Sequence, residues 1–570
     1  ELGTSLRYNP RMPSPNAPLI VQADLTVLLE LAAADAAVAR ESLTAFAELV
    51  KSPEYIHTFR ITPLSIWNAC STGFSAERIV DCLERYSRYA VPKNLISEVR
   101  ELASRFGKLV LTRAQDELEL QSEDPDVMVQ LAENPRFGAL LWRTGPSTFG
   151  VKLADRGRLK VELIKLGLPV RDLAGFTKGE PLEVSLAEAM RNGEPLSLRP
   201  YQQDAAGAFY AGGADDGGSG VVVLPCGAGK TIVGMASLVG VGASTLILTT
   251  NTTAVRQWMD ELLDKTTLDK DQIGEYTGAA KDIRPVTVAT YQVLTHRKTK
   301  EHEFTHLGLF DAREWGLIIY DEVHLLPAPV FQATASLQAR RRLGLTATLV
   351  REDGLERDVF ALIGPKCWDM PWKELEQQGW IAKATCTEIR VELPRYLLGE
   401  YSVAAERKKL RIASENPEKI KLIQYLMSKH PEEPTLIIGT FVDQLHTISK
   451  TLGLPLITGK TPQKVREQLF EDYRQGRQRA LVVSKVANFA VDLPDAAVAI
   501  QVSGTFGSRQ EEAQRLGRIL RPKKGLNQAS FYSLVTSETK EEEFAIKRQL
   551  FLCEQGYEYT IIQDGEELVK

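Results

Sequence analysis

The 570-residue sequence predicts an α/β protein with two tandem, doubly wound parallel-sheet lobes behind an N-terminal mixed α+β domain. Three observations lead to this prediction. From residue 219 onward, short β-branched runs alternate with helical patterns. Several of these runs end in hydroxyl or small polar residues, and the same alternation restarts after about residue 385. Such alternation is typical of parallel sheets that are covered by helices.

Composition limits the class of protein. A chain with 44% hydrophobic and 25% charged residues at this length is too long for one core, and we expect three domains. A formal charge of −5 gives no indication of a globally basic nucleic-acid binder, although local basic patches stay open. The six cysteines form no CxxC pair and no cluster of four, which disfavours a zinc ribbon or an iron–sulfur site.

Localisation follows from the same composition. The cysteine usage fits a reducing compartment. The sequence shows no basic region followed by an apolar leader, and no run of about 18 apolar residues that would predict a membrane span. We therefore expect a soluble cytoplasmic protein with no membrane partner.

Residues 1–190 are expected to form an N-terminal accessory domain and a linker. "ERIVDCLERYSRY" carries apolar residues at helical spacing, and "PLIVQADLTVLLE" begins as a strand. Aromatic residues in a region such as 1–190 lie more often in the core than on a binding surface, so they indicate no function. The two lobes are expected at 191–385 and 386–555, and a C-terminal tail at 556–570.

The stretch "SGVVVLPCGAGKTIVGMASL" predicts a strand, a phosphate-binding turn and a helix. Glycines let backbone N–H groups surround phosphate oxygens, Lys230 can reach the outer phosphates, and Thr231 can place a hydroxyl on Mg²⁺. The loop departs from the usual pattern because Leu224 occupies the place of the first glycine. The expected phosphate-loop residues are Leu224, Pro225, Cys226, Gly227, Ala228, Gly229, Lys230 and Thr231.

A second buried strand, "LIIYDEVH", ends in acids 91 positions after the lysine (321 − 230). Asp321 is the expected ligand for Mg²⁺ or its waters. Glu322 can orient and deprotonate a water that attacks the γ-phosphate. His324 is close enough to sense that phosphate and pass its state on. An Asp-Glu pair alone is more often a solvated turn, but the phosphate loop upstream favours catalysis.

The segment "EEAQRLGRILRPKKG" places Arg515, Arg518 and Arg521 on one face of a predicted helix. A solvated surface is the ordinary explanation of such a row. The second lobe lacks a phosphate loop of its own, which favours a different interpretation. In this interpretation Arg518 and Arg521 reach across the cleft between the two lobes and act as arginine fingers.

Four segments together resemble the superfamily-two helicases, and more narrowly the XPB family of DNA-repair helicases in its bacterial form. They are "LPCGAGKT", "YDEVHLLPAPVF", "LTAT" followed by "RED", and "EEAQRLGRILRPK". The resemblance implies RecA-like lobes and an ATP- and Mg²⁺-dependent DNA helicase or translocase with 3′ to 5′ polarity and a role in DNA repair. It implies single-stranded or forked DNA as partner, a nuclease or other repair protein as a further candidate, a monomer, and a nucleoid-associated location in a bacterium.

The resemblance also assigns residues. It implies that Gln202 of "LRPYQQ" reads adenine and that a Thr-Ala-Thr element couples hydrolysis to DNA. The segment "SKVANFAVDLP" departs from eukaryotic members, which carry Gly-Asp where Ala487 and Asn488 stand, so coupling through this loop stays open. The implied residues are Arg199, Tyr201, Gln202 and Asp492 for the nucleotide, Gln514, Arg518 and Arg521 for catalysis, and Thr346, Thr348, Arg351, Glu352 and Asp353 for coupling.

Candidate DNA contacts are less distinctive. The basic segment "EYSVAAERKKLRIAS" lies where XPB-like proteins carry a thumb-like insertion, near residues 394–416, and a solvated helical face is the alternative. Several strand ends lie where relatives contact the phosphate backbone. The candidates are Lys408, Lys409 and Arg411 in the basic segment, and Thr249, Thr252, Thr290 and Ser484 at the strand ends.

Two function classes stay open from the sequence. One is a DNA helicase or translocase. The other is a DNA-stimulated ATPase that acts as a double-strand translocase or nucleotide-gated clamp and separates strands poorly. Both would share every ATP residue. A phosphate-binding enzyme such as a small-molecule kinase is disfavoured by the second lobe and its arginine row.

Overall fold

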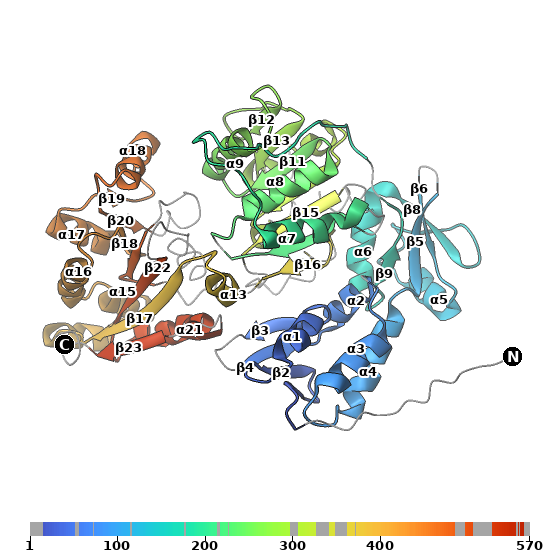
Figure 1. Ribbon diagram of the computed structural model, residues 1–570, viewed down its shortest axis with the longest axis horizontal. Helices are drawn as coiled ribbons and strands as arrows, with labels where there is room; N and C mark the ends of the chain where they lie inside the picture. The colour runs from blue at the N-terminus through green and yellow to red at the C-terminus, as the bar shows by residue number, and fades with distance from the viewer. Residues whose placement is uncertain are drawn as a thin grey trace.

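The computed structural model describes residues 15–51, 56–71, 73–114, 117–175, 178–213, 217–225, 227–296, 306–326, 341–347, 359, 362–370, 372–484, 496–504, 527–554, 557 and 559–563. Within these residues the chain forms sheets of four, five, seven and seven strands. The two smaller sheets come first in the sequence, and the two larger sheets follow as separate lobes (Figure 1).

The first unit is an antiparallel sheet covered by helices. Helix α3 shows why its sequence folds this way. Ser75 caps it by accepting a hydrogen bond from the Arg78 N–H, and Ile79, Leu83 and Tyr86 recur on its buried face. The elements are β1 (Leu19–Val21), β2 (Thr26–Glu30), α1 (Ala36–Thr44), β3 (Glu48–Lys51), β4 (Ile56–Arg60), α2 (Pro63–Ser71), α3 (Ala76–Tyr86) and α4 (Lys93–Arg105).

The second unit has a five-stranded sheet of order β7-β8-β6-β5-β9 and its own buried core. Buried Arg156 holds the edge strand β9 through two hydrogen bonds to the Asp172 carboxylate, of 2.7 and 3.0 Å. The elements are β5 (Leu109–Ala114), β6 (Glu117–Gln121), α5 (Pro125–Glu133), β7 (Trp142–Arg143), β8 (Thr148–Lys152), η1 (Leu153–Asp155), α6 (Arg156–Lys165) and β9 (Val170–Asp172). The region for which the sequence indicates one mixed domain thus holds two sheets with separate cores.

Lobe 1 is an all-parallel sheet of order β12-β13-β11-β14-β15-β10-β16. Its central strands are buried along their whole length, as expected when helices cover both faces. The elements are α7 (Pro200–Tyr210), η2 (Ala211–Gly213), β10 (Ser219–Val223), α8 (Lys230–Val241), β11 (Thr245–Thr249), α9 (Thr252–Lys265), β12 (Ile273–Tyr276), β13 (Val286–Thr290), α10 (Tyr291–Leu294), η3 (Leu307–Asp311), β14 (Leu317–Asp321), η4 (Val323–Leu325), β15 (Arg341–Thr346), β16 (Lys366–Asp369) and α13 (Trp372–Gln377).

Lobe 2 is a second all-parallel sheet, of order β19-β20-β18-β21-β22-β17-β23. The elements are β17 (Lys383–Val391), α14 (Arg395–Val403), α15 (Glu406–Ser414), α16 (Glu418–Lys429), β18 (Thr435–Gly439), α17 (Val442–Leu452), β19 (Leu456–Ile457), α18 (Gln463–Arg474), β20 (Ala480–Ser484), β21 (Val498–Gln501), β22 (Gln528–Thr536), α21 (Lys540–Glu554) and β23 (Tyr559–Gln563). The predicted fold class, two tandem α/β lobes behind a mixed N-terminal part, is confirmed.

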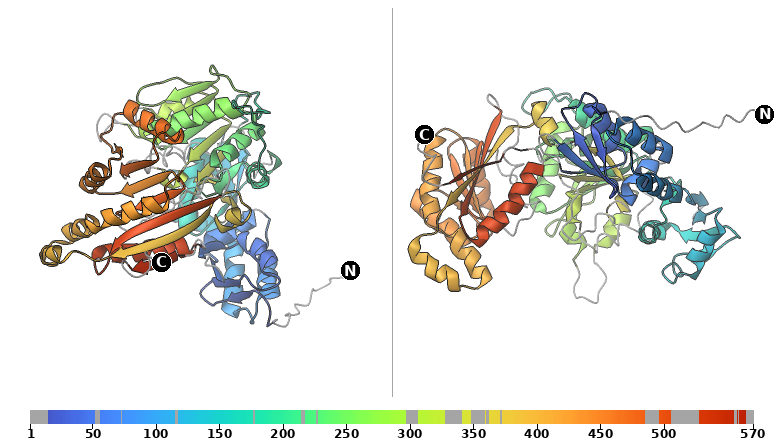
Figure 2. Two further views of the ribbon diagram at one scale, coloured as in Figure 1. Left: turned by 60° about the vertical axis from the view of Figure 1, so that its left-hand side comes forward. Right: turned by 90° about the horizontal axis from the view of Figure 1, so that it is seen from below.

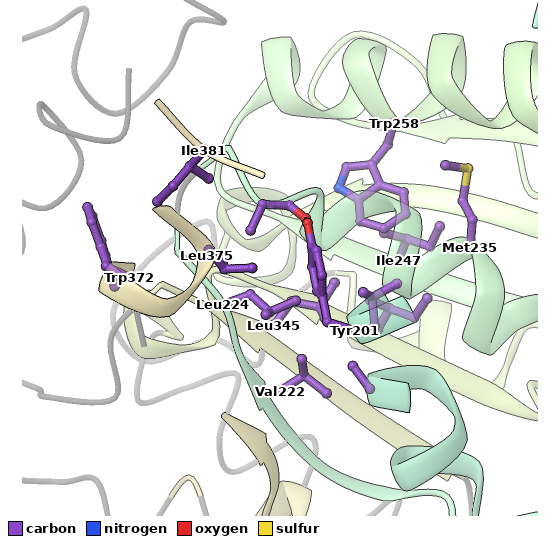
Figure 3. Close-up of a cluster of buried hydrophobic side chains, with 14 of the residues drawn as sticks. Tyr201, Val222, Leu224, Met235, Ile247, Trp258, Leu345, Trp372, Leu375 and Ile381 are labelled. Atoms are coloured by element: carbon purple, nitrogen blue, oxygen red, sulfur yellow. The ribbon is translucent and has the colours of Figure 1, made fainter. Parts of the chain in front are cut away.

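Specific side-chain contacts join the N-terminal units to lobe 1 and lobe 1 to lobe 2. Figure 2 shows, in its right-hand view, lobe 1 (green) between the N-terminal units (blue and cyan) and lobe 2 (orange to red). Arg40 of α1 pairs with Glu374 of α13 at 2.5 Å. At the junction of the lobes, Tyr201, Trp372 and Ile381 belong to one cluster of buried apolar side chains that runs through both lobes (Figure 3). In the part of the chain that the structure describes, no helix is long and apolar enough to cross a membrane.

Candidate active site

The phosphate loop connects β10 to α8. Gly227 and Gly229 adopt φ values of 83° and 81°, in the left-handed region that favours glycine. A Cβ atom at Gly229 would lie only 2.5 Å from the Gln202 side-chain nitrogen, so any larger residue there would displace the Gln202 amide. Leu224, at the position of the missing first glycine, is fully buried, and its N–H donates to the Thr346 carbonyl at 3.0 Å. The loop therefore leaves the sheet as a continuation of β10.

The segment predicted to read adenine packs directly on the phosphate loop. Gln202 is buried, and its amide N–H donates to the Ala228 carbonyl at 3.1 Å. The Tyr201 hydroxyl donates to the same carbonyl at 2.7 Å. The Arg199 guanidinium lies 5.0 Å from the centre of the Trp380 ring. Gln202 and Tyr201 thus contact the loop, and Arg199 reaches it through Tyr201, whose hydroxyl accepts from the guanidinium at 3.1 Å. Trp380 joins them from the segment that leads into lobe 2.

The catalytic candidates meet at the carboxyl end of β14. Glu322 has φ 50° and ψ 53°, a conformation that non-glycine residues rarely adopt and that is typical of functional sites. Its Oε1 lies 3.4 Å from Lys230 Nζ, and its Oε2 lies 3.5 Å from His324 Nδ1. His324 Nδ1 is also 2.7 Å from the Thr346 hydroxyl. The fold therefore brings together residues from the phosphate loop, β14, η4 and β15.

The electrostatics of Asp321 are those of a buried acid. Burial raises the pKa of the Asp321 carboxyl to about 6, and the neighbouring Glu322 carboxylate contributes to that rise. The indole N–H of Trp258, which donates to Asp321 Oδ2 at 2.9 Å, and the Lys230 charge oppose it. A divalent cation would favour the charged carboxylate in the same way.

The donor set fits magnesium that arrives with a nucleotide. Among the described residues, no group of three or more His, Cys, Asp and Glu side chains could hold a metal by itself. Magnesium usually keeps several waters and is bound through one or two carboxylates plus substrate phosphates. Asp321 at the end of β14 could supply such a carboxylate, and Thr231 in the first turn of α8 could add a hydroxyl ligand, so a preformed protein cage is not required.

Three of the four candidate DNA contacts that the sequence predicts at strand ends lie at the carboxyl edges of the sheets, and the fourth, Thr252, lies in a helix. Thr249, Thr290 and Ser484 are the last residues of β11, β13 and β20, and all three are buried. The Thr290 hydroxyl caps α10 by accepting the Val293 N–H at 3.3 Å, whereas buried Ser484 Oγ has no hydrogen-bond partner among the residues described. Thr252 begins α9 and is half-buried.

The basic segment forms the hairpin α14–α15. Each of its three candidate cations is paired with a carboxylate on the surface: Lys408 with Glu400 at 3.0 Å, Lys409 with Glu406 at 3.8 Å, and Arg411 with Glu415 at 2.9 Å. Such exposed pairs are weak and are screened by salt, so the cations stay available to other anions.

Several predicted site residues lie outside the described residues: Cys226, Thr348, Arg351, Glu352, Asp353, Asp492, Gln514, Arg518 and Arg521. Two contacts of the site were missed by sequence reasoning. Trp258 and Tyr291 each donate a hydrogen bond to Asp321, but in the sequence both resemble ordinary core aromatics. The available signal is general, since a buried indole or phenol usually needs a polar partner.

Three family models match the chain. The model described as "ERCC3/RAD25/XPB C-terminal helicase" matches residues 375–570, and "Type III restriction enzyme, res subunit" matches residues 195–351. A model described as "Helicase conserved C-terminal domain" matches residues 19–144, which lie at the other end of this chain.

Relatives that align over nearly the whole chain carry the XPB name as well. The chain is 52% identical over 555 residues to "DNA 3'-5' helicase XPB" of Kineococcus radiotolerans, with 97% of both chains covered. It is 52% identical over 556 residues to the protein of the same name in Mycobacterium tuberculosis, covering 97% of this chain and 99% of the relative. A more distant relative, 30% identical over 569 residues, is "General transcription and DNA repair factor IIH helicase/translocase subunit XPB" of Enterocytozoon bieneusi, with 96% and 93% covered. The resemblance predicted from the sequence is thereby confirmed: the chain belongs to the XPB family of DNA 3′–5′ helicases and is an ATP-dependent enzyme of that family.

Proposed function

We propose that ATP hydrolysis at the edge of lobe 1 drives 3′ to 5′ movement along single-stranded or forked DNA in DNA repair. The observation that carries the proposal is the distance of 3.4 Å between Lys230 Nζ and Glu322 Oε1. It supports the proposal because Lys230, the proposed phosphate-binding cation, and Glu322, the proposed general base, share one strand edge, where α/β sheets bind ligands. Relatives named for DNA helicase and DNA repair activity support the assignment.

Each residue of the site has a separate task in this proposal. Backbone N–H groups of the glycine loop and Lys230 hold the outer phosphates of ATP. Glu322 orients the attacking water and accepts its proton as the bond to the γ-phosphorus forms. His324 is hydrogen-bonded to Thr346 and lies beside Glu322, so it joins the base to the end of β15. Asp321 and Thr231 would hold the magnesium ion, which would supply positive charge that neutralises the phosphates.

The remaining assignments complete the cycle. Gln202, Arg199 and Tyr201 would recognise adenine, Gln202 and Tyr201 from their contacts with the Ala228 carbonyl of the loop and Arg199 from its contact with Tyr201. Arg518 and Arg521 would enter from lobe 2 as arginine fingers, and Arg521→Ala should lower DNA-stimulated hydrolysis by about 10²-fold. In this proposal Asp492 and Gln514 assist nucleotide binding and catalysis from lobe 2, and Thr346, Thr348, Arg351, Glu352 and Asp353 couple hydrolysis to DNA.

A second candidate is a double-strand translocase that unwinds poorly. It is favoured by the name "helicase/translocase subunit" of a relative that this chain matches over 96% of its length. Both candidates use the same ATP site.

One experiment separates the two candidates. Strand displacement on a forked duplex and third-strand displacement from a triplex are measured beside DNA-stimulated ATPase activity, with Glu322→Gln as the inactive control. The helicase proposal expects ATP-dependent separation of the fork from a 3′ overhang. Triplex displacement without fork unwinding would instead support the translocase. ATPase activity that DNA does not stimulate would contradict both.

The organisation proposed for the whole chain is an accessory part over 1–190, lobes over 191–385 and 386–555 with a thumb near 394–416, and a tail over 556–570. We further propose that the protein acts as a monomer at the bacterial nucleoid and meets a nuclease or another repair protein there. Analytical ultracentrifugation of the purified chain tests the first part of this proposal.

A further inference from the structure

Two buried aromatic donors converge on Asp321. The Trp258 indole N–H donates to Oδ2 of the Asp321 carboxylate at 2.9 Å. The Tyr291 hydroxyl donates to the Asp321 backbone carbonyl, also at 2.9 Å. Trp258 and Tyr291 expose only 2% and 3% of their surfaces. The carboxylate side chain and the main chain of one residue are therefore each held from outside β14.

The Trp258 ring packs closely against α8 at Gly234. A Cβ atom at Gly234 would lie 2.6 Å from Cη2 of the ring, which no side chain there could accept without a shift. Gly234 follows Lys230 by one helical turn, so the indole lies between the phosphate-loop helix and β14. Figure 3 shows the ring extending from its helix, with Met235 and Ile247 beside it.

The chemistry of indole suits this position. An indole N–H is a donor only, so its partner oxygen must accept and the carboxylate cannot rotate without losing the bond. Because the site is buried, water does not readily replace a lost donor. Groups that hydrogen-bond to a metal-ligating carboxylate fix its orientation, and removing one typically costs about 10- to 100-fold in metal affinity.

We infer that Trp258 and Tyr291 are positioning residues, which fix the Asp321 carboxylate for the divalent cation of the nucleotide complex. The inference rests on the proposed role of Asp321 as a magnesium ligand. The inference adds a requirement to the site. Besides the phosphate loop and the acidic strand end, Asp321 needs one hydrogen-bond donor from α9 and one from α10. Without these donors the Asp321 carboxylate would be poorly oriented.

The test uses Mn²⁺ as the probe, in the presence of ADP, with free Mn²⁺ measured by electron paramagnetic resonance. Trp258→Phe keeps an aromatic ring and removes the N–H, and should weaken Mn²⁺ binding roughly 10- to 100-fold. Trp315→Phe is the matched control. Trp315 is equally buried in lobe 1, and its N–H donates to the Leu309 carbonyl at 3.0 Å, away from the site. Mn²⁺ affinity should stay within about twofold of wild type in this control, since the metal's surroundings are unchanged.

A second variant covers the case in which Trp258→Phe does not fold. Tyr291→Phe removes one hydroxyl from a buried ring and should weaken Mn²⁺ binding by up to about 10-fold. In either folded variant, the magnesium concentration that gives half-maximal ATPase activity should rise more than the saturated rate falls. Wild-type Mn²⁺ affinity in the folded positioning variants would overturn the inference.

Asp321→Asn separates failure of the inference from failure of the proposed site. If Asp321→Asn binds Mn²⁺ and ADP as wild type does, the magnesium role of Asp321 is wrong and the inference loses its basis. If Asp321→Asn loses Mn²⁺ binding while Trp258→Phe and Tyr291→Phe keep it, the site stands and only the positioning role is overturned.

Discussion

The two lobes share one topology and differ in the segments that connect corresponding strands to the next helix. Numbered along the chain within each lobe, both sheets have the strand order 3-4-2-5-6-1-7. Strand β10 therefore corresponds to β17. A glycine-rich turn and α8 come after β10, whereas Leu393, Pro394 and α14 come after β17. Equal topology thus does not imply equal chemistry, because the turn after the first strand decides whether phosphates can bind.

Two lysine–glutamate ion pairs, Lys230–Glu322 in lobe 1 and Lys419–Glu541 in lobe 2, differ in burial. Lys230 and Glu322 lie 3.4 Å apart, with side chains 10% and 22% exposed. Lys419 and Glu541 lie 2.7 Å apart, with side chains 1% and 2% exposed, and Glu541 also accepts the Thr536 N–H at 3.0 Å. We therefore expect Lys230 and Glu322 in lobe 1 to exchange each other for a ligand, and we expect the buried pair Lys419–Glu541 in lobe 2 to be structural.

The largest expected effect is a loss of unfolding free energy when the buried pair Lys419–Glu541 is broken. Lys419→Met removes the cation and leaves Glu541 buried without its charged partner, which typically costs about 3 to 5 kcal/mol of unfolding free energy. Lys421→Met is the control. Lys421 lies two residues further along α16 in an exposed pair with Glu418, and such pairs contribute about 1 kcal/mol or less. Urea denaturation measures both variants, and equal stabilities would contradict the structural role.

The next effect concerns catalysis in lobe 1. Glu322→Gln keeps the shape of the side chain but removes the charge that polarises water, so ATP turnover should fall by about 10²-fold or more while ATP binding survives. Glu541→Gln is the matched change in lobe 2 and should lower stability, with little effect on turnover per folded molecule. Near wild-type ATPase activity in Glu322→Gln would refute the assignment of the general base.

The lobes were predictable because their signals are local. A β-branched run, two glycines and Lys230 predict a phosphate loop within a short segment, and Asp321 at the end of an apolar run predicts an acidic strand end. The restart of this pattern after about residue 385 predicted lobe 2 in the same way. Each of these predictions depends on residues that are neighbours in sequence.

Contacts between distant segments were not predictable. Trp258 donates to an acid 63 positions away, and its sequence context shows only an amphipathic helix. The division of the N-terminal part into two sheets likewise depends on which strands pair, and strand patterns alone do not determine pairing. The ion pairs that Lys408 and Arg411 form with neighbouring carboxylates depend on side-chain placement, which a run of basic residues does not show.

A smaller effect, on nucleotide affinity, distinguishes the proposed role of Lys230 in ATP binding from that of Glu322 in ATP hydrolysis. Lys230→Ala removes a charged hydrogen-bond donor from the outer phosphates, a loss of about 10- to 100-fold in nucleotide affinity. Glu322→Gln should keep that affinity, so the two variants should differ in a titration with a fluorescent ATP analogue. Should both bind the analogue equally well, the lysine would have a smaller role than the geometry indicates.

The smallest expected effect concerns the surface of lobe 2, where the comparison predicts cations that are paired but replaceable. Lys408 is 60% exposed in its pair with Glu400, so Lys408→Ala should change the unfolding free energy by less than about 1 kcal/mol. If Lys408 contacts a phosphate, the slope of log Kd for single-stranded DNA against log salt should fall by about one in magnitude. Lys421→Ala, which removes a lysine 74% exposed in a similar pair on α16, should leave that slope unchanged. Equal slopes for Lys408→Ala and wild type would make the α14–α15 hairpin a solvated surface. The strand-end residues Thr249, Thr252, Thr290 and Ser484 would then be the remaining proposed DNA contacts.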